Sequence, residues 1–173
     1  EYLKFMREKL NYPKKVELLF RGSENKFKVA SFHEKCDNIP DTFTLVKTEF
    51  GKIIGGFSQY TWNAANQAYL SHNSKKTFLL SFDLMQKMIP LSESNLIYCH
   101  PSYGPTFGSH DLYLSDSCHE NNSSFGNFPK CYNWEGEEKY TNNQNSYKAW
   151  SGATENGKFK IVEYEVFRVV YEW

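Results

Sequence analysis

The sequence predicts an α+β fold that is mainly β: a two-sheet antiparallel β-sandwich with flanking short helices. Three observations lead to this prediction. Aromatic residues make up 17% of the 173 residues, and such side chains favour strands. Apolar residues fall mostly in short runs bounded by Gly, Pro, Asn or Ser, as in strands that end at turns. Candidate strands outnumber candidate helices, and neither an internal repeat nor a linker divides the chain.

The first fourteen residues predict an amphipathic helix that forms a junction to an upstream module. Leu3, Met6 and Leu10 recur at helical spacing, with charged residues between them, and the pattern ends before Pro13. Residues 15–173 are then expected to form the folded domain.

A strand over 16–20 and a turn over 21–25 open this domain. Ser23 is expected to cap a short helix over about 26–36, in which Phe27, Ala30 and Phe32 lie partly on one side.

Residues 42–47 and 52–58 alternate polar and apolar side chains around the short turn 49–51, which predicts a β-hairpin. Gly55 and Gly56 inside the second strand indicate either a bulge or the close approach of other backbone or a side chain.

Further strands are expected over 77–82, 96–99 and 112–114, with one long strand over 158–171. The segment 117–157 is rich in Asn, Ser, Glu and Lys, and is expected to be mostly loop around one short strand at 124–127.

The charge balance excludes one class of partner. The formal net charge is zero, and only three of the 20 basic residues are arginine: Arg7, Arg21 and Arg168. Nucleic-acid binding favours a basic footprint and guanidinium groups, so no nucleic-acid partner is expected. No apolar run approaches the ~18 residues of a membrane-spanning helix, so no membrane span is expected.

The four cysteines (Cys36, Cys99, Cys118 and Cys131) form no CxxC pair, which disfavours a zinc ribbon. Cys118 with His119, or with Cys131, could still ligate a metal, and the count alone permits two disulfides. Buried, reduced thiols are the preferred interpretation, with no metal and no cofactor.

The stretch 100–116, HPSYGPTFGSHDLYLSD, gathers histidines, serines and aspartates and resembles a catalytic loop. His110 and Asp111 are adjacent, so in a strand they would face opposite ways and could not form a dyad. The stretch contains no G-x-S-x-G elbow, P-loop or dinucleotide fingerprint. A hydrolase or redox enzyme that uses His110, Asp111 and a cysteine therefore remains only an alternative hypothesis, and no catalytic residue is assigned.

A structural role accounts for the same stretch better. Gly104 and Gly108 permit backbone conformations closed to other residues, and Asp111 can accept N–H bonds within its own turn. The stretch is then expected to lead the chain from one sheet to the other.

Glu163 and Glu165 share one face of the last predicted strand. Like charges repel, so either both are exposed or one is buried with a raised pKa. A solvated polar face is the simpler interpretation, and an acidic patch for a basic partner is the alternative.

Taken together, several segments resemble a TLDc domain in their order and spacing over roughly residues 16–170, and most closely the TLDc proteins of unicellular eukaryotes. The first half carries VELLFRGS from Val16, FHEKCD from Phe32, GKIIGGF from Gly51, and Trp62. The second half carries FLLSF from Phe78, the 104–114 loop and strand, Ser124-Phe125-Gly126-Asn127, and IVEYEVF from Ile161. The glycine-rich run before Leu112 is shorter than in many animal members, and Phe167 stands where they carry Trp.

The resemblance implies a two-sheet β-sandwich and a non-enzymatic protein-interaction domain. It further implies docking to and regulation of the vacuolar proton-pumping ATPase (V-ATPase), oxidative-stress resistance, and a cytoplasmic location that is peripheral to endomembranes or the cytoskeleton. Asp111, Glu163 and Glu165 match acidic positions implicated in the family. A scaffold component of a cytoskeletal or ciliary assembly is the rival hypothesis.

Overall fold

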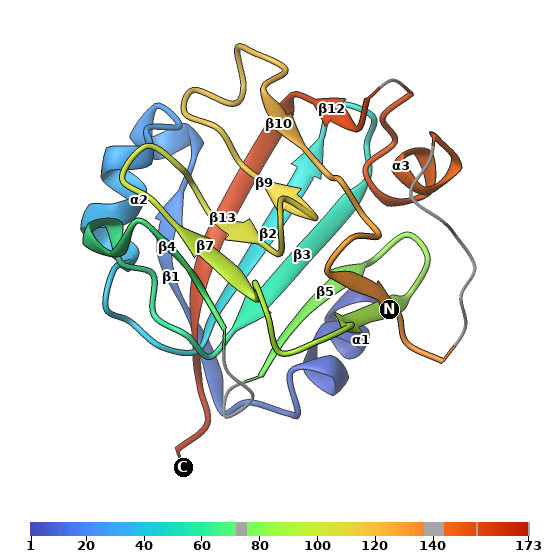
Figure 1. Ribbon diagram of the computed structural model, residues 1–173. Coiled ribbons are helices and arrows are strands. Elements are labelled where there is room, and N and C mark those ends of the chain that lie inside the picture. The colour runs from blue at the N-terminus through green and yellow to red at the C-terminus, as the bar shows by residue number, and fades with distance from the viewer. Residues whose placement is uncertain (72–75, 137–143, 155, 173) are drawn as a thin grey trace.

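The computed structural model describes residues 1–71, 76–136, 144–154 and 156–172, which form two antiparallel sheets packed face to face (Figure 1). The strands of the seven-stranded sheet are, in spatial order, β1 (Lys15–Arg21), β13 (Ile161–Val170), β2 (Thr42–Thr48), β3 (Ile53–Ser58), β5 (Thr77–Ser81), β6 (Gln86–Pro90) and β11 (Tyr132–Trp134). Those of the six-stranded sheet are β12 (Lys158–Phe159), β10 (Ser124–Phe125), β9 (Leu112–Tyr113), β8 (Thr106–Phe107), β7 (Ile97–Cys99) and β4 (Ala68–Leu70). The predicted antiparallel sandwich is confirmed.

The described helices flank these sheets. They are α1 (Tyr2–Lys9), α2 (Val29–Cys36) and α3 (Gln144–Trp150), with two short 3₁₀ turns, η1 (Ser23–Asn25) and η2 (Ala64–Asn66). In Figure 1, α2 lies at one side of the six-stranded sheet and α3 at the other, while β7 and β9 face the viewer. No helix in the described ranges is long and apolar enough to cross a bilayer.

The main core lies between the two sheets, where every second residue of each strand points inward. Val46, Ile54 and Leu79 of the seven-stranded sheet are buried in one cluster with Ile97 and Phe107 of the six-stranded sheet. Burial of such large side chains stabilises the fold by roughly 2 kcal/mol each.

A second cluster lies on the outer face of the seven-stranded sheet, beneath α1. Phe5 and Leu10 are buried there against residues of β2, β3, β5 and β13, with Phe82 just past the end of β5. The predicted helix at the N-terminus forms, but its predicted apolar stripe is partly wrong, because Leu3 is 72% exposed and Phe5 takes the buried position.

The hairpin predicted around residues 49–51 is confirmed by β2 and β3, which pair without a break in register. Close approach, rather than a bulge, accounts for the paired glycines. A Cβ on Gly56 would come within 2.5 Å of the Phe107 ring, and one on Gly55 within 2.7 Å of Phe43. Gly56 therefore lets a six-stranded-sheet phenylalanine pack directly on the backbone of β3.

The helix predicted over 26–36 begins three residues later than expected, and Ser23 does not cap it. Lys26 and Phe27 have positive φ angles (52° and 54°), which interrupt a right-handed helix. The Val29 N–H instead donates a hydrogen bond to Asp116 Oδ1 at 2.8 Å. The helix start is thus fixed from a distant loop, which local sequence cannot reveal.

The strand expected over 158–171 is two strands in different sheets: β12 pairs with β10, whereas β13 pairs with β1 and β2. The segment 117–157 also holds more structure than expected, because β11 and α3 form in addition to β10. Part of this segment, residues 137–143 and 155, lies outside the described residues. The short strands β4, β6 and β8 were not predicted either.

The stretch 100–116 does not lead from one sheet to the other. The chain leaves β7 at Cys99, forms β8 and then β9, and all three strands belong to the six-stranded sheet. The prediction of a sheet-to-sheet turn is therefore wrong, because the glycines and prolines here serve tight turns within one sheet.

Candidate functional site

A network of seven aromatic rings occupies the outer side of the six-stranded sheet. Tyr69 pairs with Tyr98 across β4 and β7, and Tyr113 pairs with Phe125 across β9 and β10. Paired residues lie on the same side of a sheet, while their neighbours, such as Ile97 and Leu112, are buried on the inner side. We call this set the aromatic face; its members are Tyr69, Tyr98, His100, Tyr103, His110, Tyr113 and Phe125.

Tyr103 lies at the centre of the aromatic face. Its ring centroid is 5.3 Å from that of Tyr98, 4.8 Å from Tyr113 and 5.8 Å from His110. His110 stacks on Phe125, with centroids 5.3 Å apart and the rings inclined by 19°. Edge and stacked contacts of this kind add to the free energy of burial and hold each ring in place. All seven rings remain partly open to solvent, and Tyr69 is 38% exposed.

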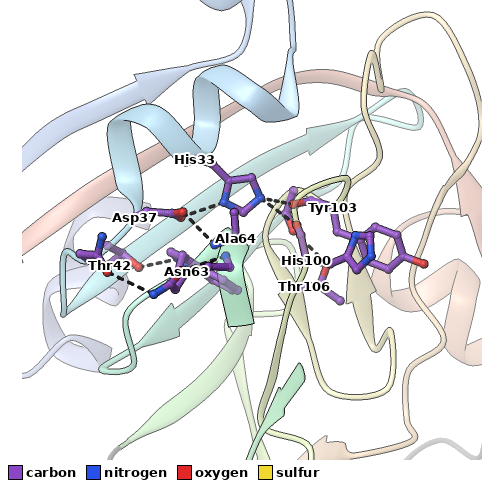
Figure 2. A network of polar contacts seen from close by, with 12 residues as sticks. His33, Asp37, Thr42, Asn63, Ala64, His100, Tyr103 and Thr106 are labelled. Carbon is purple, nitrogen blue, oxygen red and sulfur yellow. Dashed lines mark hydrogen bonds and ion pairs between the residues drawn. The ribbon is translucent and has the colours of Figure 1, made fainter. Parts of the chain in front are cut away.

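His33 fixes the turn that carries two of these rings. Its Nε2 lies 2.9 Å from the carbonyl oxygens of both His100 and Tyr103, and since a carbonyl only accepts, the ring nitrogen donates. Its Nδ1 lies 2.8 Å from Asp37 Oδ1. Figure 2 shows the imidazole between Asp37 and this turn. His33 therefore anchors the turn to α2.

Asp37 extends this anchor to the segment before β4. Its second oxygen accepts the Ala64 N–H at 2.9 Å, and the Asn38 N–H donates to the Trp62 carbonyl at the same distance. Trp62 itself is buried and donates from Nε1 to Thr42 Oγ1 at 3.0 Å. The family-motif tryptophan thus has a structural role, because it links this polar network to β2.

Asp111 anchors the other half of the aromatic face from beneath. Its buried carboxylate accepts the backbone N–H groups of Lys130, Cys131 and Tyr132 at 2.8 to 3.1 Å. The prediction that Asp111 accepts bonds within its own turn holds only in part: the carboxylate interacts with its own backbone N–H, but its main donors lie in a segment about 20 residues away. Burial raises the pKa of Asp111 to about 6, against the opposing effect of the backbone N–H donors.

Two glycines of the motif permit this arrangement. Gly108 has φ +65°, and a Cβ there would collide with the Asp111 carboxylate. Gly104 donates its N–H to the Leu114 carbonyl at 2.9 Å. Asn127, the last residue of the motif, donates its N–H to the His110 carbonyl at 2.8 Å. Gly104, Gly108 and Asn127 are therefore brought together around the Asp111 loop, whereas Gly55 and Gly56 lie on β3.

The side chains of His110 and Asp111 lie in different surroundings. His110 has φ +70° and its ring joins the aromatic face, whereas the Asp111 carboxylate points to the backbone of 130–132. Burial lowers the pKa of His110, so the ring is predominantly neutral at pH 7.

Three of the four thiols are poorly suited to redox chemistry. Burial raises the pKa of Cys36 and of Cys118 to about 12 and also raises that of Cys99, and the thiolate is the reactive form. Cys131 is half-buried and accepts the Ser109 N–H at 3.3 Å. Within the described ranges, no group of three or more His, Cys, Asp or Glu side chains is arranged to hold a metal ion.

The three acidic candidates do not form one patch. Asp111 is buried behind the six-stranded sheet, whereas Glu163 and Glu165 lie on β13. Glu165 pairs with Arg21 at 3.3 Å, and Glu163 Oε1 accepts the Ser23 N–H at 3.1 Å. These two carboxylates serve the turn after β1 in this structure.

Sequence reasoning missed the aromatic face as a unit, although a signal for it exists. In Ile97-Tyr98-Cys99 and Leu112-Tyr113-Leu114, a tyrosine stands between two apolar residues at the outward position of a strand.

Comparison with known families gives one match. The model of the TLDc domain matches residues 1–170, so the matched range includes α1 as well as both sheets. A search of curated proteins finds no significant match.

Proposed function

Because this chain belongs to the TLDc domain family, we propose that it is a protein-interaction domain without catalytic chemistry of its own and that it docks to a large assembly through the aromatic face. One observation carries the proposal: seven interlocked rings lie partly exposed on a sheet face over which Figure 1 places no helix of the described chain. Tyrosine-rich, preformed surfaces are typical of protein interfaces, because their rings offer large contact area at low cost in conformational entropy.

The partner proposed is the vacuolar proton-pumping ATPase, with regulation of that pump as the link to oxidative-stress resistance. The family resemblance supports this choice. A cytoplasmic location at the periphery of endomembranes is part of the same proposal. The absence of an enzymatic role is supported by the divergence of His110 from Asp111 and by the raised thiol pKa values.

Capture on detergent-solubilised vacuolar membranes tests the proposal. The full chain should retain pump subunits, detected by immunoblotting, and a variant with His110→Ala and Tyr113→Ala should lose them. Tyr12→Ala is the matched control, since Tyr12 is 58% exposed and lies outside the aromatic face. Failure of the wild type to retain any subunit would overturn the choice of partner. Retention by the His110/Tyr113 variant would overturn the choice of surface.

Fluorescence microscopy separates the pump from the rival scaffold. An endomembrane pattern is expected, whereas an axonemal or filamentous pattern would favour the cytoskeletal or ciliary role.

A further inference from the structure

We propose that the aromatic face binds an extended proline-rich segment flanked by acidic residues. This inference rests on the proposed docking function and adds the chemistry of the partner segment. Three properties of the face lead to it: the shape of its rings, the hydrogen-bonding capacity that its tyrosines leave unused, and the charges at its rim.

The rings suit flat, rigid, apolar groups. Tyr69, Tyr98, Tyr103 and Tyr113 run across the face in successive contacts of 4.6, 5.3 and 4.8 Å between centroids. Neighbouring rings in this row are inclined to each other by 42°, 61° and 56°. Polyproline II segments, which repeat every three residues and are largely rigid before binding, dock on aromatic-lined surfaces of this kind.

The hydroxyl groups supply donors to a ligand that has mainly acceptors. Among the described residues, no hydrogen bond engages the hydroxyls of Tyr98, Tyr103 or Tyr113. A proline has no backbone N–H, so a proline-rich segment presents carbonyl oxygens that need donors. The same hydroxyls can also accept N–H groups, so an ordinary extended peptide is the alternative that the Gly-Ser probe below tests.

The rim of the aromatic face is positively charged while its centre is neutral. Lys130 lies close enough to His110 to lower the pKa of that ring further, and Lys158 pairs with Phe125 across β10 and β12. Both lysines are exposed. Asp116 is close enough to Tyr113 to raise its pKa, but this carboxylate pairs with Lys28 at 3.4 Å. Acidic residues beside the prolines therefore complement the rim.

The probe for this inference is a synthetic octaproline peptide with aspartates at both ends. Titration of the full chain, followed in aromatic ¹H–¹³C NMR spectra, should shift the resonances of the aromatic face and leave Tyr12 unchanged. A peptide with the same ends and an alternating Gly-Ser centre should bind at least about tenfold more weakly, since it lacks rings and rigidity. Replacing the aspartates by lysines should also weaken binding.

Two variants locate the contact. Tyr103→Ala should weaken binding about tenfold or more, as expected for a central aromatic contact residue. Tyr103→Phe keeps the ring and should weaken binding about threefold through the lost donor; it also serves if the alanine variant fails to fold. Tyr12→Ala is the control and should bind like wild type.

Equal affinity for the octaproline and Gly-Ser peptides would overturn the inference. Resonance shifts confined to residues outside the aromatic face would also overturn it. So would tighter binding of oligothymidylate, a single-stranded nucleic-acid probe, than of octaproline. The two experiments test separate claims. If the His110/Tyr113 variant loses pump capture but the full chain does not bind octaproline, the proposed docking surface stands and only this ligand is refuted. Octaproline binding without pump capture would refute only the partner.

Discussion

The outer face of the seven-stranded sheet is covered in part by α1, whereas the outer face of the six-stranded sheet carries the aromatic face, with α2 and α3 at its sides (Figure 1). The covered side is built from phenylalanines and aliphatic residues, among them Phe43, Phe57 and Phe78. The open side is built from tyrosines and histidines, which join an apolar body to a polar edge. The difference separates a side that is packed for stability from the side that we propose for docking.

The strongest test of this comparison concerns the anchor beneath the open side. Gly108→Ala should lower the free energy of unfolding by about 4 kcal/mol, because a Cβ at a positive φ is strained and would here also displace the buried Asp111 carboxylate. Gly136→Ala is the matched control, since Gly136 also has a positive φ (+89°) but has open space around its Cβ position. It should cost about 1 kcal/mol.

Urea denaturation followed by tryptophan fluorescence measures both glycine variants. Equal losses in the two would mean that backbone strain alone, and not the Asp111 anchor, sets the requirement for Gly108.

Truncation on the covered side should cost stability and leave docking unchanged. Phe5→Ala should lower the free energy of unfolding by about 3 kcal/mol, because Phe5 is buried between α1 and the sheet. Leu3→Ala, two residues away on the exposed side of the same helix, should change it by less than about 0.5 kcal/mol. If the folded fraction of Phe5→Ala captured less of the pump than wild type, the division between a stability side and a docking side would be wrong.

The Asp111 anchor should also make stability depend on pH. Its pKa is raised from 3.8 to about 6 in the folded state, so the folded protein binds a proton more tightly than the unfolded chain between these values. Its contribution is therefore fully present below pH 4 and is lost as pH rises through 6, by on the order of 3 kcal/mol. Asp111→Asn should remove this slope, measured as the difference between urea midpoints of wild type and variant across pH 4 to 7. An identical slope in both proteins would show that Asp111 does not titrate in this range.

The smallest effect on stability is expected at the open side itself. Tyr98→Thr retains a strand-favouring residue on β7 and should cost less than about 1 kcal/mol, because the Tyr98 ring is only partly buried. The same variant should reduce octaproline binding severalfold. A loss of stability as large as that of Phe5→Ala would show that the open side is a core in its own right.

The elements that the sequence predicted best are those with local signals. The hairpin of β2 and β3 follows from alternation on both sides of one short turn. The start of α2 could not be predicted, since it depends on Asp116. The division of the last strand into β12 and β13 at Lys160 could not be predicted either, because only pairing with β10 separates the two. The short strands β4, β8 and β11 have too few residues to show a period.

The candidate site was predicted in its parts and not as a whole. Gly104, Gly108 and Asp111 were identified as structural, which their positions support, but the partner of Asp111 lies 20 residues away. The aromatic face draws its rings from β4, β7, β9, β10 and two turns. Its assembly depends on the strand order of the six-stranded sheet, and one sequence contains no direct record of that order.

The place of β13 has a consequence for how the protein folds during synthesis. This strand lies between β1 and β2, and it pairs Val170 with Lys15. A ribosome must therefore release the β13 segment before β1 can join the sheet, and a nascent chain that ends before Ile161 keeps β1 apart from β2. Contacts this distant in sequence slow folding, since the whole intervening chain has to be closed into a loop first. Nascent chains halted before β13 should thus remain sensitive to protease and dependent on chaperones.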